Sequence, residues 1–151
     1  MATVTITSPV AGGTALTTEL NTLSGTTTSL FTVPSAAITT TLHLFADFTF
    51  TSGSGGAILP VAGGYMALYI IPGGPTASYP VANTATVGPG ESYLAAILPL
   101  PAISSVSHVA HAYNVPVPPY DFKVVIGNYS GVNLFSSGNT LAYKWHDLTV
   151  A

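Results

Sequence analysis

Residues able to carry out acid–base chemistry or to bind a metal are few in this sequence: four His, five Asp or Glu and two Lys among 151 residues. His108 and His111 are an odd number of positions apart, so on a strand they lie on opposite faces and cannot share a metal ion. His43 and Asp47 share a strand face, but their separation of about 13 Å is too long for a hydrogen bond. Local spacing therefore predicts no metal site at these histidines.

The local pattern also lacks a catalytic dyad or nucleophile. His146 and Asp147 are consecutive, so on a strand they diverge, and a dyad requires distant parts of the chain to meet. Ser54 and Ser130 lie in turn-like segments without the Gly-x-Ser-x-Gly elbow of a serine hydrolase. We predict no catalytic residue, no cofactor and no metal; a hydrolase stays open only if a His and a carboxylate converge in one pocket. No spacing pairs two carboxylates for glycoside hydrolysis among Glu19, Asp47, Glu91, Asp121 and Asp147.

The low content of charged residues indicates which kinds of partner to expect. Only 5% of the residues are charged, whereas an ordinary soluble domain carries about 25%. Because 48% of the residues are hydrophobic, so few charges protect poorly against self-association, and we infer that other protein covers much of the surface. Lys123 and Lys144 are the only basic residues besides His, so the chain cannot neutralise several phosphates. Nucleic acid and anionic membranes are therefore not expected as partners.

Length and composition predict the domain organisation. A chain of 151 residues can bury one core, which predicts a single domain over residues 1–151. The absence of Cys excludes disulfides and thiolate metal sites and suits a reducing compartment. The sequence shows neither an export leader nor an uninterrupted apolar run of about 18 residues, so we expect neither export nor a membrane span.

Short runs of Thr, Val, Ile, Phe and Tyr, broken by 15 Gly and 12 Pro, predict an all-β fold. About eight such runs favour a jelly-roll-like antiparallel β-sandwich, with a closed barrel as the alternative. Both faces of residues 64–71 are apolar and require cover. The predicted strands are residues 2–7, 26–33, 39–50, 64–71, 92–98, 105–113, 121–128 and 140–150.

The clearest of these strands is residues 39–50, in which every second residue is apolar. Side chains of a strand alternate between its two faces, so one set is expected to face the core. That set is Leu42, Leu44, Ala46, Phe48 and Phe50.

Residues 1–30 are rich in Thr, and two interpretations of them stay open. The segment is either an extended arm that pairs with a neighbouring subunit, or an ordinary edge strand and loop of the same sandwich. Its Pro-Val-Ala-Gly-Gly sequence, residues 9–13, has the composition of a turn.

The aromatic residues are candidates for packing or for sugar binding. Tyr143 and Trp145 share one face of the last predicted strand, and Tyr65 and Tyr69 share a face of another. Such rings fill cores and subunit contacts, and they can also stack on sugars. Packing is the interpretation that we favour.

The C-terminal third carries a pattern of strand and turn residues. Phe122-Lys123, an apolar run and Asn128 are followed by Gly131, and then by Ser-Gly-Asn-Thr-Leu at residues 137–141 and by Tyr143. Over residues 118–143, this pattern resembles small virion-associated β-proteins of tailed bacteriophages. The pattern includes no catalytic residue.

This resemblance implies a structural protein of a phage particle, such as a capsid decoration or cement protein. Such a chain is not an enzyme; it forms a homo-oligomer, here expected to be a trimer, and binds the major capsid protein or another virion subunit. It resides in the virion after assembly in the bacterial cytoplasm. The Thr-rich N-terminal segment and exposed aromatic residues are the expected contacts. The alternative is a glycan-binding module of a tail or host-attachment structure, which uses Tyr, Trp145 and Asn or Asp side chains.

Overall fold

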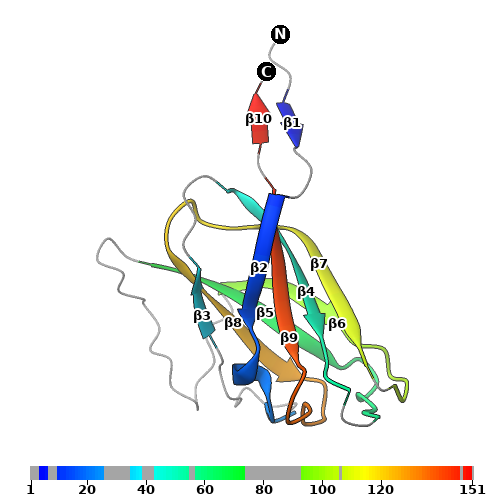
Figure 1. Cartoon of the computed structure of the whole chain (residues 1–151). Coiled ribbons are helices and arrows are strands. Elements are labelled where there is room, and N and C mark those ends of the chain that lie inside the picture. Colours follow the sequence, from blue (N-terminus) through cyan, green and yellow to red (C-terminus); the bar gives the residue numbers. More distant parts are fainter. Residues whose placement is uncertain are drawn as a thin grey trace.

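The chain is an antiparallel β-sandwich, which confirms the all-β prediction (Figure 1). The computed structural model describes residues 4–6, 10–25, 35–38, 43–54, 57–73, 93–105, 107–146 and 148–150. The strands are β1 (Val4–Ile6), β2 (Val10–Leu16), β3 (Ser35–Ile38), β4 (Phe45–Thr51), β5 (Tyr65–Pro72), β6 (Leu94–Pro99), β7 (Val109–Pro116), β8 (Phe122–Tyr129), β9 (Thr140–His146) and β10 (Leu148–Val150). A short 3₁₀ helix, η1 (Thr18–Leu20), follows β2.

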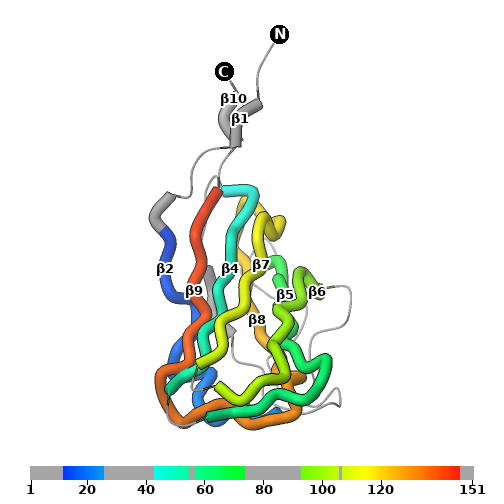
Figure 2. Tube along the Cα trace, turned by 90° about the vertical axis from the view of Figure 1, so that its right-hand side faces the viewer, coloured from blue at the N-terminus to red at the C-terminus, as the bar shows by residue number. Residues whose placement is uncertain are grey.

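Two four-stranded sheets form the layers of the sandwich. Their strand orders are β2-β9-β4-β7 and β3-β8-β5-β6, and all their pairings are antiparallel. Figure 2 shows β2, β9, β4 and β7 side by side in the first layer. A separate two-stranded sheet pairs β1 with β10, so that both ends of the chain lie together (Figure 1). Among the described residues, no helix is long and apolar enough to cross a membrane.

The core lies between the two sheets. Ala46, Phe48 and Phe50 alternate with partly exposed residues along β4 and are fully buried, as predicted. The prediction is wrong for Leu44, which is 39% exposed because it precedes the first residue of β4. The same prediction for Leu42 lies outside the described residues.

The strand β5 is covered on both faces, which confirms the prediction for residues 64–71. Met66, Leu68 and Ile70 belong to the main core. Ala67, Tyr69, Ile71 and Val125 form a second buried cluster on the opposite face, against which three tyrosines pack. Those tyrosines are Tyr65, Tyr93 and Tyr129.

Most other predicted strands are present with shifted ends. Residues 2–7, 92–98, 105–113 and 121–128 correspond to β1, β6, β7 and β8. The predicted strand over residues 140–150 is instead two strands, because β9 pairs with β2 and β4 in the sandwich whereas β10 pairs with β1. The predicted strand 26–33 lies outside the described residues.

The strands β2 and β3 were not predicted from the sequence. Residues 10–13 were interpreted as part of a turn, but they belong to β2, the edge strand beside β9. Glycine is required at residue 12 because an added Cβ would overlap the carbonyl group of Tyr143 on β9. Leu16, Leu20 and Leu23 are buried in the core. Residues 10–25 are therefore an edge strand and loop of the same sandwich rather than an arm.

Two buried asparagines hold the loops at one end of the sandwich, and both belong to the C-terminal pattern described above. The Asn128 amide group donates hydrogen bonds to the carbonyl oxygens of Leu23 (3.0 Å) and Val132 (2.8 Å). Its oxygen accepts from the Ser130 backbone N–H (3.0 Å) and hydroxyl group (2.6 Å). In the same way, the Asn139 side-chain oxygen accepts a hydrogen bond from the Gly53 N–H, and its amide group donates one to the carbonyl oxygen of Phe135.

The approach of two loops at Gly53 gives a testable prediction. An added Cβ at this buried residue would overlap the carbonyl oxygen of Ser137. We expect Gly53→Ala to lower the free energy of unfolding by about 1–3 kcal/mol, the usual cost of overpacking, in urea denaturation. The neighbouring exposed Ser54→Ala should change it by less than about 0.5 kcal/mol. Equal stability of the two variants would show that this loop is not tightly packed.

Candidate binding surfaces

The outer face of the β2-β9-β4-β7 sheet is polar and contains a pocket. Its volume is about 280 Å³, and it opens between β7, β4 and β9. In this chain of few charges, the pocket brings together a carboxylate, an ammonium group and an imidazole. The residues that line it include Asp47, Thr49, His111, Tyr113, Ala142 and Lys144.

A β-bulge shapes the pocket. Ala46 pairs with Val115 and Phe48 with Ala112, so that Asp47 faces two residues of β7, Tyr113 and Asn114. Asn114 has a positive φ of 52°, a conformation that Asn tolerates better than most residues. Beside the bulge, Tyr113 lies on the outer face of β7 and is 66% exposed. A bulge of this kind redirects side chains and is common beside binding sites.

The Asp47 carboxylate is held on both oxygens. The Asn114 backbone N–H donates to Oδ1 (2.8 Å), and His146 Nε2 lies 2.6 Å from Oδ2. Because an ionised carboxylate only accepts hydrogen bonds, Nε2 carries the hydrogen. The pairing of His146 with Asp47 across β9 and β4 was not predicted, because 99 residues separate them and only sheet register brings them together.

The Asp47–His146 pair has a carboxylate and an imidazole, but no nucleophile accompanies it among the described residues. His146 Nδ1, the atom that would activate a hydroxyl group in a catalytic triad, is buried and has no hydrogen-bond partner in the part of the chain that the structure describes. The pair therefore orients the Asp47 carboxylate.

His111 holds the exposed ring of Tyr113. Its Nδ1 lies 3.0 Å from the Thr49 hydroxyl group, and its ring stacks on Tyr113 with centroids 5.5 Å apart and an interplanar angle of 18°. By contrast, His108 is buried, with Nε2 3.2 Å from the carbonyl oxygen of Ile58. The two histidines thus have different surroundings, as their spacing predicted. No group of three potential metal ligands occurs among the described residues.

The aromatic residues singled out in the sequence have mainly packing roles. Trp145 is buried and contacts three rings: His43 (4.9 Å), Phe122 (6.3 Å) and Tyr143 (4.8 Å between centroids). Tyr65 stacks on Tyr129 in the second buried cluster, at 5.1 Å.

Tyr69 belongs to the same cluster as Tyr65 and Tyr129. Burial, and then a hydrogen bond with Tyr69, raises the pKa of Tyr129. Tyr113 was not among the residues singled out, although it lies two positions after His111 on the exposed face of β7.

The β3-β8-β5-β6 sheet has an apolar outer face. The second buried cluster occupies its centre, and at the edge strand β6 Leu94 and Ile97 are exposed. The register pairs Ile97 with Ala67 of that cluster, so the two residues share the outer face. This face is therefore apolar from the buried cluster to the edge of the sheet, and it is exposed at Leu94 and Ile97.

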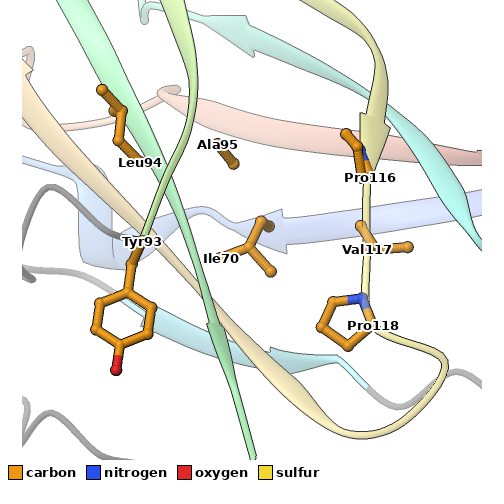
Figure 3. Close-up of a pocket in the computed structure, with 7 residues that line it drawn as sticks. All are labelled: Ile70, Tyr93, Leu94, Ala95, Pro116, Val117 and Pro118. Carbon is orange, nitrogen blue, oxygen red and sulfur yellow. The ribbon is translucent and has the colours of Figure 1, made fainter.

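An apolar groove lies where the edges of the two sheets meet. Its volume is about 480 Å³, and Ile70 lies between its two walls (Figure 3). One wall comes from β6 and the residue before it, and the other from the end of β7 and the residues that follow. The wall residues are Tyr93, Leu94, Ala95, Pro116, Val117 and Pro118.

Comparison of the chain with protein-family models, with curated proteins and with solved structures finds no match. The function therefore has to be argued from these surfaces.

Proposed function

We propose that this chain is a non-enzymatic structural protein of a tailed-phage particle, of the capsid decoration or cement type. It forms trimers and binds the outside of the shell, so that it resides in the virion. The observation that carries the proposal is the exposure of two large apolar side chains, Leu94 and Ile97, on the edge strand β6 of the β3-β8-β5-β6 sheet. An exposed apolar surface of this kind is typical of protein–protein contacts.

The edge strand β6 adds backbone groups to this surface. It is the last strand of its sheet, and no described strand pairs with its outer side. Edge strands are usually protected by charged residues, Pro or β-bulges; β6 ends in Pro99 and has a bulge in its pairing with β5, but it contains no charged residue. With seven charged residues in the whole chain, little opposes the approach of another subunit. A subunit contact at β6 would cover both the apolar side chains and the open edge.

The strand orders support a jelly-roll-like interpretation of the sandwich. Of the connections from β2 to β9, only β5 to β6 joins neighbours within one sheet, and all the others cross between sheets. Jelly rolls with this type of crossing are common among viral capsid domains and lectins. The fold is therefore compatible with a particle protein, and the exposed apolar residues of β6 support a role in assembly.

The proposal is tested by light scattering coupled to size-exclusion chromatography, with the protein alone and mixed with shells from the same source. We expect a trimer that elutes with the shells. Ile97→Lys places a charge on a side chain that is 52% exposed, so it should leave the fold intact. It should weaken the contacts between subunits, and with them trimer formation or shell binding, at least about tenfold.

Tyr120→Lys is the matched control for this experiment. Tyr120 is 51% exposed and lies in the loop before β8, outside the edge strand β6. Its replacement should leave both trimer and shell binding unchanged. A wild-type monomer that does not bind shells would refute the proposal.

A further inference from the structure

The pocket between β7, β4 and β9 combines a mainly apolar lining with a few polar side chains and an exposed aromatic ring. We propose that it binds a neutral saccharide unit, with a sugar ring on the face of Tyr113 and hydroxyl groups on Asp47, Thr49 and Lys144. This site lies on the outer face of the opposite sheet from the apolar surface. It does not depend on the virion assignment.

The charges of the pocket select a neutral ligand rather than an ion. Asp47 and Lys144 are paired in register on β4 and β9, so a negative and a positive group flank the same space. For an anionic ligand, attraction to the ammonium group is offset by repulsion from the carboxylate, and for a cationic ligand the reverse holds, so neither gains a net charge attraction. Sugar hydroxyl groups both donate and accept hydrogen bonds, so one ring can satisfy both side chains.

The polar groups are held in place before a ligand arrives. Asp47 uses one acceptor position on each oxygen for Asn114 and His146, and a carboxylate has about four such positions. Two acceptor positions therefore remain for ligand hydroxyl groups. A carboxylate that is already oriented loses little entropy on binding, which improves affinity.

The ring of Tyr113 is also held in place before a ligand arrives. The Thr49 hydroxyl group fixes the His111 ring, and that ring stacks on one face of Tyr113. The electron-rich face of an aromatic ring attracts the weakly positive C–H groups of a sugar. A nucleobase would also stack there, but a nucleic acid needs cationic partners for its phosphates, and the chain has two Lys.

The floor of the pocket depends on a small residue. Ala142 of β9 lies between Thr49 on β4 and Thr14 on β2 in the register of the sheet. The volume of about 280 Å³ is just below the range of roughly 300–1,000 Å³ that is usual for small-molecule sites. This size suits a monosaccharide or the terminal unit of a longer chain.

The test uses an array of monosaccharides, disaccharides and bacterial surface polysaccharides, followed by calorimetric titration of the best-binding saccharide. The wild type should bind, and Tyr113→Ala should lose about tenfold or more in affinity. Ala142→Leu, which fills the floor, should have a similar effect. Tyr120→Ala removes a comparably exposed tyrosine outside the pocket and should bind as the wild type does. Thermal melting of each variant confirms that the fold is retained.

A second readout places the ligand at Asp47. The backbone amide signal of Asn114 in an NMR titration with the same saccharide should shift, because that N–H donates to the Asp47 carboxylate. The proposal is overturned if the wild type binds no saccharide, or if Tyr113→Ala and Ala142→Leu both bind as tightly as the wild type. It is also overturned if these variants lose shell binding and keep saccharide binding.

Discussion

Replacement of Asn128 by alanine is expected to lower the free energy of unfolding by about 3–5 kcal/mol, measured by urea denaturation. The side chain is fully buried and makes four hydrogen bonds within 3.0 Å or less. Its removal leaves the Ser130 N–H without its partner, whereas the carbonyl oxygens of Leu23 and Val132 each lose one of two donors and keep the Leu134 N–H and the Ser130 hydroxyl group. Each lost hydrogen bond costs about 0.5–1.5 kcal/mol, and the unpaired N–H about 1–3 kcal/mol.

Asn133→Ala is the matched control for this prediction. Asn133 is exposed, and its side-chain oxygen accepts one hydrogen bond, from the Gly25 N–H at 3.0 Å. We expect a loss of about 1 kcal/mol or less, because water can replace that bond. If the two variants had the same stability, the Asn128 network would not be what holds the 20–25 loop against the end of β8.

Replacement of Trp145 by alanine is expected to cost about 3–5 kcal/mol in the free energy of unfolding, the usual range for a large aromatic residue in a core. Trp145 is buried in the main core and contacts the rings of His43, Phe122 and Tyr143. Circular dichroism during denaturation measures the loss. Tyr120→Ala, at an exposed ring, should change stability by less than about 0.5 kcal/mol.

The single Trp also provides an independent measurement on the unmodified protein. Because Trp145 is buried, its fluorescence should be that of an apolar environment and should change only when the fold is lost. Addition of a saccharide should leave the emission unchanged. A Trp145→Ala variant of native stability would mean that this ring lies on a binding surface, and the packing interpretation would then be wrong.

The parts of the fold that depend on local pattern were predictable. Residues such as Phe48 and Phe50 are two positions apart on an alternating strand, and both are buried. The two apolar faces of β5 likewise required cover on both sides. In both strands, the pattern of apolar residues along the sequence indicates which faces of the strand are buried.

The strands β2 and β3 could not be predicted because their residues have no strand pattern of their own. Gly12 and Gly13 look like turn residues, and the reason for glycine is the close approach of β9, which a linear sequence does not reveal. The strand β3 is Ser-Ala-Ala-Ile, which contains a single β-branched residue, and it forms by pairing with β8. Tertiary pairing specifies both strands.

The candidate saccharide site was hidden for the same reason. Asp47, His111 and Lys144 come from three strands that are neighbours only in the folded sheet. The bulge beside Tyr113 arises from the pairing register of β4 and β7, which the sequence alone does not reveal. The resemblance in the C-terminal third gave no indication of this site, because its Asn128 and Asn139 hold loops at one end of the sandwich.

The pairing of β1 with β10 determines how the molecule would respond to mechanical load. Val4 pairs with Val150 and Ile6 with Leu148, so a force that pulls the two ends apart breaks these pairs one after another. The next pairs along the same path join β2 to β9, from Val10 and Trp145 onward. Pulling on both ends would thus peel the edge strand β2 away like a zipper, at low force, before the strands in the middle of the sheet bear any load.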